Sequence, residues 1–289
     1  MKRRHFIKSA LIGSGALSLS SFPYHLYARP EKKYAHDRIK LGNTGVEVSR
    51  VAMGTGTIGG GKSSNQTRKL GIKGLADLLH AAYDEGVTFW DSADQYGSHP
   101  HLKEALKYVP REKVVILSKT RARTAEDMKS DLERFKEEIG TDYIDIILLH
   151  ARMSASWPAE NKSVMEALSE AKENGIVKMV GVSCHSLAAL EAAADEPWVD
   201  IDLARWNPAG LHMDADVSVV EKVLKRMKSN GKTIMGMKVL GQGDLADKKD
   251  ECLQFHLGTE FIDCFTVGFE SYDEFKDILK RIPEASVRA

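Results

Sequence analysis

The chain has 289 residues, 43% of them hydrophobic and 28% charged, which is an ordinary globular composition. Its 41 Lys and Arg residues balance 41 Asp and Glu residues, so the formal net charge is zero and we expect no nucleic acid as a main partner. The three cysteines, Cys184, Cys252 and Cys264, form no CxxC pair, so we expect neither a disulfide framework nor a metal site.

The first thirty residues differ from the remainder. Adjacent Arg3 and Arg4 precede a weakly apolar run over residues 10–22 that glycine and serine interrupt. This order resembles a twin-arginine export signal, and a basic amphipathic helix is the alternative. The run is too short to span a bilayer, which takes about 20 apolar residues. We assign residues 1–30 to a leader and predict export to the periplasm or cell envelope, with the twin-arginine translocase as a partner.

After the leader, apolar residues alternate on both sides of a Gly-Asn-Thr-Gly turn over residues 38–49, which predicts a β-hairpin. Short apolar runs and helical patterns then take turns to the end of the chain. The predicted strands are Val51–Thr55, Thr88–Ser92, Val114–Ser118, Ile144–Leu149, Val177–Val182, Ile201–Ala204, Thr233–Met237 and Cys264–Val267. The predicted helices are Leu75–Asp84, His99–Lys107, Ala125–Glu138, Ser163–Asn174, Leu187–Ala194, Val217–Ser229, Lys248–His256 and Tyr272–Arg281.

Eight strands that each precede a helix predict a closed (β/α)8 TIM barrel over residues 38–285, preceded by the hairpin. A doubly wound open sheet is the alternative, and it would need a glycine-rich phosphate turn directly before its first helix. Glycines lie between Gly54 and Gly61, but the polar stretch 63–65 separates them from the predicted helix. The barrel is therefore favoured.

Polar side chains stand where predicted strands end, and in a TIM barrel that end holds the active site. Asp91 ends the second strand and Tyr96 follows it, Lys119 follows the third strand, and His150 follows the fourth. Taken singly, these residues are more typical of a helix cap, a rim charge or a structural histidine. Together they bring a carboxylate, a phenol, an ammonium and an imidazole to one mouth.

This combination suits the reduction of a carbonyl group. Hydride addition leaves negative charge on oxygen, which then needs a proton. A tyrosine has an ordinary pKa near 10, and a neighbouring ammonium such as Lys119 lowers it by stabilising the phenolate. Asp91 would keep Lys119 charged and in place, and His150 would donate a hydrogen bond to the substrate oxygen.

These motifs resemble the aldo/keto reductase family over residues 38–279. The resemblance is carried by Ile39–Arg50, Gly86–Gly97, Ile116–Lys119, Gly140–His150 and Gly175–Ser183. It implies that Tyr96 is the general acid, that Lys119 and Asp91 tune it, and that His150 orients the carbonyl. It also implies NADPH or NADH as the cofactor, bound without a Rossmann domain. The cofactor-binding residues are then expected to be Gly54, Thr55, Asp91, Ser183, Lys238 and Leu240.

The chain departs from the family's pattern around the cofactor. Cys184 stands where the family usually has Asn, Leu203 where it usually has Gln, and Met237 where an aromatic residue often stacks on the nicotinamide. Residues 266–274 contain acids in place of the cations that hold the 2′-phosphate of NADPH.

The sequence thus predicts an exported oxidoreductase that reduces a small carbonyl compound, or oxidises the alcohol, with a nicotinamide cofactor. One alternative is an exported ligand-binding or non-redox barrel that keeps the four catalytic residues without the usual cofactor contacts. Another is an enzyme that uses the same acid and base groups without hydride transfer.

Overall fold

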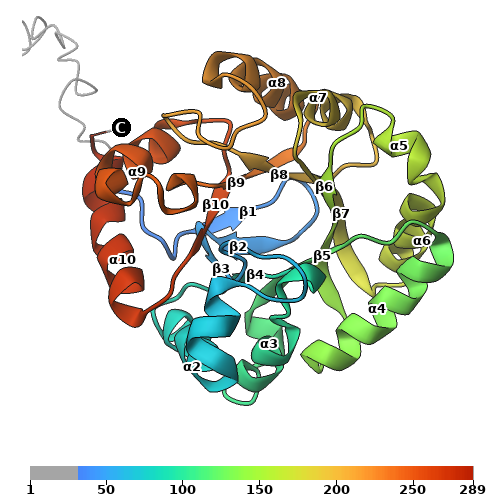
Figure 1. The fold of residues 1–289 in the computed structure, drawn as a ribbon, viewed down its shortest axis with the longest axis horizontal. Helices are drawn as coiled ribbons and strands as arrows, with labels where there is room; N and C mark the ends of the chain where they lie inside the picture. Colours follow the sequence, from blue (N-terminus) through green and yellow to red (C-terminus); the bar gives the residue numbers. More distant parts are fainter. Residues whose placement is uncertain (1–31, 289) are drawn as a thin grey trace, which may run out of the picture. The chain divides into compact units, whose positions relative to one another are not determined.

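The computed structural model describes residues 32–288, so the predicted leader lies outside the described residues. Within them, eight parallel strands close into a barrel, and the helices surround it (Figure 1). In order around the barrel the strands are β3 (Val51–Gly54), β4 (Phe89–Asp91), β5 (Val115–Thr120), β6 (Ile144–Arg152), β7 (Val177–Cys184), β8 (Ile201–Arg205), β9 (Thr233–Met237) and β10 (Cys264–Gly268). The predicted TIM barrel is confirmed, and the doubly wound alternative is wrong.

The helices follow the strands in regular alternation. The main ones are α2 (Asn65–Asp84), α3 (His99–Ala105), α4 (Ala125–Ile139), α6 (Lys162–Glu173), α7 (Leu187–Asp195), α8 (Val217–Ser229), α9 (Lys249–Gly258) and α10 (Tyr272–Ser286). Short turns of helix are η2 (Asp94–Tyr96), η3 (Arg111–Lys113), α5 (Trp157–Glu160), η4 (Gly241–Gly243) and η5 (Ala246–Lys248). None of the helices described is both long enough and apolar enough to cross a membrane.

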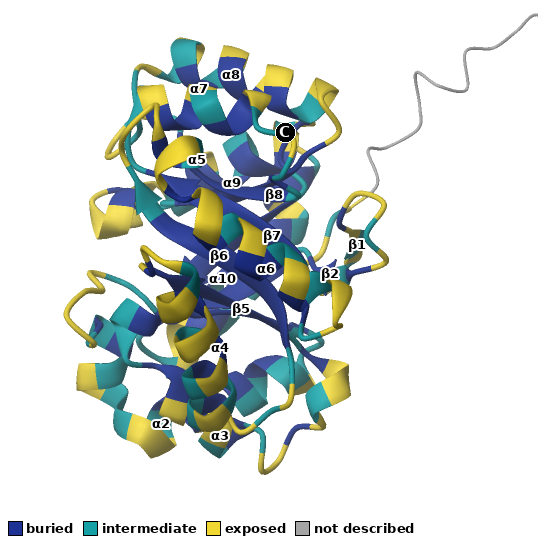
Figure 2. Ribbon diagram, turned by 90° about the vertical axis from the view of Figure 1, so that its right-hand side faces the viewer, coloured by how far each residue is buried: buried dark blue, intermediate teal, exposed yellow. Residues whose placement is uncertain are grey.

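The predicted hairpin, β1 (Arg38–Lys40) and β2 (Glu47–Ser49), is present and antiparallel. Its apolar residues Leu41, Val46 and Val48 are buried in one cluster with inward-facing residues of the strands. The hairpin therefore closes the end of the barrel at which the strands begin. A second, larger cluster fills the space between the strands and the helices, and Figure 2 shows the strands dark blue between helices whose outer faces are yellow. The apolar interior leaves the other end of the barrel as the place for polar chemistry.

Helix α2 begins ten residues earlier than the Leu75 start that the sequence predicts. Ser64 caps it, because its hydroxyl accepts from the Thr67 backbone while Thr67 bonds back to the Ser64 N–H. The first turns lack a continuous apolar face and are interrupted at Gly71, where φ is +63°. The polar stretch 63–65 is thus the helix cap, and not the separating loop that we expected.

Helix α9 packs against β9 through a buried histidine. His256 is 2% exposed, and its Nε2 lies 2.7 Å from the Trp206 carbonyl oxygen. A Cβ atom on Gly236 would lie 2.6 Å from the His256 ring, so only glycine leaves room for it. Burial lowers the pKa of His256 to about 4, although the Trp206 carbonyl opposes this shift.

We expect His256 to contribute to acid denaturation. Its pKa is lower in the folded chain than the ordinary 6.5, so protonation opposes folding. The stability that neutral His256 contributes is therefore complete above pH 6.5 and is lost as the pH falls to 4. The loss corresponds to about 3 kcal/mol of unfolding free energy. The free energy of unfolding, measured by urea titration at several pH values in this range, should fall less steeply with falling pH in His256→Gln than in the wild type. His80→Gln, at a partly exposed position on α2, should fall as steeply as the wild type. Equal slopes for all three proteins would contradict this account.

Candidate active site

The structure brings the four predicted catalytic residues together at the open end of the barrel. The Lys119 ammonium donates to an oxygen of Asp91 and to the Ser92 carbonyl, the latter at 2.8 Å. Its Nζ lies 4.8 Å from the centre of the Tyr96 ring. The rings of Tyr96 and His150 meet edge to face, with their centres 5.6 Å apart. A phenol, an ammonium and an imidazole therefore lie around one point.

Thr266 on β10 also belongs to this site, and we did not predict it. Its hydroxyl donates to the second oxygen of Asp91 at 2.9 Å. To do so it crosses β3, where a Cβ atom on Gly54 would lie 2.8 Å from the Thr266 hydroxyl oxygen. Gly54 thus opens a path between β10 and β4. The signal for Thr266 is the same one that singled out Lys119, a polar residue close to the end of an apolar strand.

The Tyr96 ring is positioned by the loop after β3 and by buried hydroxyl groups. Gly56 and Gly59 lie against it so closely that a Cβ atom would come within 2.2 Å and 2.5 Å of ring carbons. In the loop that carries Tyr96, the Ser98 hydroxyl lies 2.8 Å from that of Thr55 and 2.7 Å from that of Ser92. The ring therefore has little freedom to move.

The electrostatic environment favours a neutral tyrosine and histidine beside a charged lysine. Burial raises the pKa of Tyr96, and the Lys119 charge opposes that rise. Burial would lower the pKa of Lys119, but Asp91 and Tyr96 outweigh it and leave that pKa raised. Burial, followed by the charges of Lys119 and Arg121, holds the pKa of His150 well below its ordinary value. A neutral imidazole keeps one N–H group, which can donate a hydrogen bond to a substrate oxygen.

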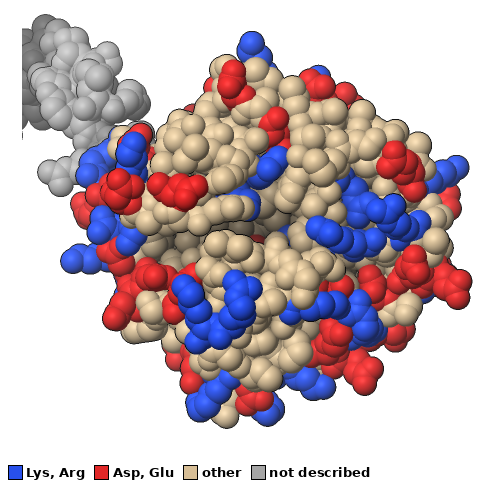
Figure 3. All heavy atoms as spheres, in the orientation of Figure 1, with Lys and Arg blue, Asp and Glu red and all other residues tan. Residues whose placement is uncertain are grey.

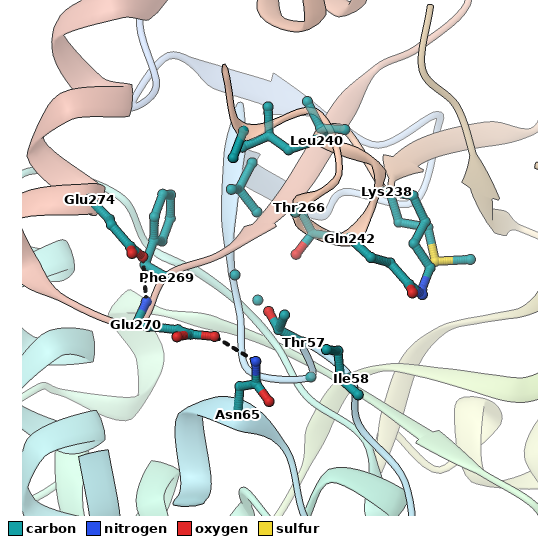
Figure 4. A pocket seen from close by; sticks show the side chains of 18 of the residues that line it. Thr57, Ile58, Asn65, Lys238, Leu240, Gln242, Thr266, Phe269, Glu270 and Glu274 are labelled. Carbon is teal, nitrogen blue, oxygen red and sulfur yellow. Dashed lines mark hydrogen bonds between the residues drawn. The ribbon is translucent and has the colours of Figure 1, made fainter. Parts of the chain in front are cut away.

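A cleft of about 350 Å³ opens beside these residues (Figure 4). It runs along the ends of β3, β9 and β10 and reaches Tyr96 and Asp91 at its inner end. Of the residues expected to bind a cofactor, Gly54, Asp91, Lys238 and Leu240 line it.

The two remaining residues expected to bind a cofactor do not line the cleft. Thr55 is buried, and its hydroxyl is bonded to the Asp91 carbonyl and to Ser98. Ser183 is also buried, and its hydroxyl accepts from the Ala151 N–H at 2.9 Å. Both therefore support the backbone around the mouth.

A sequence model of the aldo/keto reductase family matches residues 50–282, which include every strand of the barrel. The chain belongs to the aldo/keto reductase family. It is 29% identical over 172 residues to the aldo-keto reductase YhdN of Bacillus subtilis, covering 52% of this chain and 48% of that protein. It is 25% identical over 169 residues to the NADH-specific methylglyoxal reductase of Escherichia coli, covering 50% of this chain and 51% of the relative. The chain thus spans about half the length of these curated relatives.

Solved structures of the family share the fold. A putative aldo-keto reductase from Pseudomonas aeruginosa superposes with a TM-score of 0.71 at 23% identity, over 88% of this chain and 98% of that one. An aldo-keto reductase from Bacillus halodurans in its holo form gives 0.69 at 15% identity, over 87% and 91% of the two chains.

The departures from the aldo/keto reductase pattern have different positions in the barrel. Cys184 faces the helices, where its thiol lies 3.7 Å from a carboxylate oxygen of Asp202. Leu203 belongs to the apolar interior, and Met237 lines the cleft. Cys184 and Leu203 therefore pack against other residues of the barrel and do not line the cleft.

One group of side chains behind Tyr96 has a spacing that could suit a metal ion. Asp94, His99 and Glu138 place their ligand atoms within 4.8 Å of one another. Arg134 occupies this group, with Nη1 2.7 Å from Asp94 and 2.9 Å from Glu138, and the second oxygen of Glu138 lies 2.7 Å from the His99 ring. We interpret the group as an ion-pair network that holds the start of the tyrosine loop against α4.

Proposed function

We propose that this protein reduces an aldehyde or ketone, or oxidises the corresponding alcohol, by hydride transfer with NADH or NADPH. The observation that carries the proposal is the Lys119–Asp91 ion pair under the Tyr96 ring, with His150 beside it and the cleft leading to it. A nicotinamide cofactor would supply the hydride. The cleft fits a group of that kind, because it has a volume of about 350 Å³, is lined by both apolar and polar residues, and includes the proposed proton donor in its lining.

In this reaction Tyr96 would give its hydroxyl proton to the carbonyl oxygen as the hydride reaches the carbon. The tyrosine is then left as a phenolate, and the Lys119 ammonium stabilises that negative charge. Asp91 holds Lys119 in place with Thr266 as its second partner. A neutral His150 donates a hydrogen bond that orients the carbonyl. In the opposite direction the phenolate would accept the alcohol proton.

We predict that Tyr96→Phe lowers turnover by about 10²- to 10⁴-fold, because the variant keeps the ring and loses the proton donor. Steady-state rates with an aldehyde give the result, and fluorescence titration with NADH should show unchanged cofactor binding. Tyr108→Phe is the matched control, since that ring is 62% exposed and should leave both values unchanged. Turnover at the wild-type rate in Tyr96→Phe would rule out the role proposed for Tyr96.

The outer end of the cleft bears on the choice of cofactor. Glu270 and Glu274 line it, and Glu270 accepts from Asn65 at 2.6 Å (Figure 4). Glu270 is also paired with Lys69. Lys249 also lines it, but its ammonium is 2.8 Å from Asp277. Lys69 and Lys249 therefore already have carboxylate partners, and Arg68, beside Lys69 on α2, donates to Ser63 and Asn65. Selectivity for a 2′-phosphate needs a cation that is free to bind it.

We predict that NADPH binds no more than a few-fold more tightly than NADH. Parallel fluorescence titrations at one salt concentration would measure this. Glu270→Gln should raise the affinity for NADPH relative to NADH, because it releases Lys69, whereas Glu112→Gln on the far end of the barrel should not. An advantage of tenfold or more for NADPH in the wild type, about 1.4 kcal/mol, would contradict the prediction.

We propose in addition that the protein is exported by the twin-arginine route. The support is the pair Arg3 and Arg4 ahead of the weakly apolar run 10–22. Replacing both arginines with lysine should keep the protein in the cytoplasm, measured by fractionation of cells that express the full chain. Appearance of the double variant outside the inner membrane at the wild-type level would contradict export by this route.

A further inference from the structure

The geometry points to a substrate that carries an anionic group, a carboxylate or a phosphate, a short distance from its carbonyl. This inference rests on the function proposed above and goes beyond it, since it names a substrate class. Three arginines, Arg121, Arg123 and Arg152, form the surface that would bind the anion. We refer to them as the arginine rim.

The arginine rim follows the two strands that carry Lys119 and His150. Arg121 and Arg123 come directly after β5, and Arg152 is the last residue of β6. In each case the first arginine lies two residues beyond the catalytic residue. At about 3.3 Å per residue, an anion on the rim would sit roughly 6 Å outward from the carbonyl oxygen, which matches a chain of a few carbon atoms.

Within residues 32–288, no carboxylate lies within salt-bridge distance of any of the three arginines. By contrast, Arg134 on the neighbouring helix α4 has three carboxylate partners, Asp94, Asp131 and Glu138. The protein as a whole has equal numbers of acidic and basic residues, so an excess of positive charge does not explain the lack of partners at the rim.

Arg152 is the best defined member of the rim. Its side chain is partly buried, and its Nη1 donates to the Asn161 amide oxygen at 3.0 Å. Its Nε is buried, and no residue of the described chain accepts from it. Burial, followed by the charges of Arg123 and Arg121, lowers the pKa of Arg152. The three charges are therefore close enough to repel one another, and an anion between them would relieve that repulsion and satisfy the free donor.

The backbone before Arg152 is shaped for this position. Between Leu149 and Arg152, β6 advances three residues while its partner β7 advances two, so β6 contains one extra residue. Ala151 in this bulge has φ of +53°, a conformation that a non-glycine residue adopts at a cost. Such bulges re-aim side chains and are common next to active sites. The bulge separates His150 from Arg152 on the same strand.

The cofactor is an unsuitable ligand for the rim, because the two lie on different sides of the mouth. The cleft is lined from β3, β9 and β10, whereas the rim follows β5 and β6. Tyr96 follows β4, which lies between these two groups of strands. In the space-filling view, Lys and Arg side chains gather beside the hollow at the centre of this face (Figure 3). A planar guanidinium with paired donors is suited to carboxylate or phosphate oxygens.

The test compares aldehydes that differ by one anionic group: succinic semialdehyde with butanal, and glyceraldehyde 3-phosphate with glyceraldehyde. For at least one pair we expect the anionic member to have a kcat/KM about tenfold or more above its neutral partner at low salt, and added salt should reduce this preference. The first pair reports a carboxylate, and the second reports a phosphate.

Variants then assign the preference to residues. Arg152→Gln and the more exposed Arg121→Gln should each lower kcat/KM for the anionic substrate about tenfold, chiefly through KM, and should change the neutral substrate less than twofold. Lys113→Gln, an exposed cation at the other end of the barrel, removes the same charge and should change neither. Equal losses for charged and neutral substrates, or no loss in either arginine variant, would overturn the inference while leaving the proposed reaction intact.

A binding measurement separates the two proposals. Succinate and inorganic phosphate are titrated by calorimetry into the chain without cofactor, using the wild type, Arg152→Gln and Lys113→Gln. Binding that is lost only in Arg152→Gln supports the rim as an anion site even if no aldehyde is turned over, a result that would count against the proposed reaction alone. Binding of neither anion, together with equal turnover of charged and neutral aldehydes, overturns the inference alone.

Discussion

The buried ion pair between Lys119 and Asp91 is the interaction on which the rest of the site depends. Lys119 is 1% exposed and Asp91 is 5% exposed, so both charges have given up most of their hydration. Such a pair is stable only when the remaining donors and acceptors are also satisfied. The Ser92 carbonyl accepts a further hydrogen bond from Lys119, and the Thr266 hydroxyl donates one to Asp91. Removing either charged partner would leave the other buried without its counterion.

The hydrogen bond from Thr266 to Asp91 depends on how the barrel closes. Thr266 can bond to Asp91 only across β3, and β3 permits the approach because Gly54 has no side chain. The closing contact of the barrel, between its last and first strands, therefore also fixes the carboxylate of Asp91. Lys119, held by that carboxylate, in turn lies under the ring of Tyr96, whose other neighbours Gly56 and Gly59 leave it no room to turn. The contacts that close the barrel are therefore also contacts that hold the site together.

The sequence predicts those parts of the molecule that depend on local pattern. Apolar runs that stop at a polar residue located the barrel strands and, with them, Asp91, Lys119 and His150. The start of α2 was missed because its first turns are polar and contain Gly71, so that the cap at Ser64 is the only local sign of a helix. Thr55 and Ser183 stand near the expected positions, but their hydroxyls are bonded to Asp91, Ser98 and Ala151, partners that only the folded chain brings close. Pairing of Glu270 with Lys69, 201 residues apart, could not be read from a local segment for the same reason.

The distribution of charge around the mouth follows from these pairings, and not from composition. The outer end of the cleft has acids that already neutralise Lys69 and Lys249, while the opposite side has three arginines without carboxylate partners among the residues described. The net charge of zero does not reveal this asymmetry, because it is a total over all residues and does not depend on where they lie. An ion approaching the mouth responds to the local field, which low-dielectric walls strengthen. The field at the rim favours an anion beside His150, whose own pKa is lowered by burial first and then by the charges of Lys119 and Arg121. Arg121 and Arg152 can thus attract the substrate and add to the effect of burial in keeping the imidazole neutral.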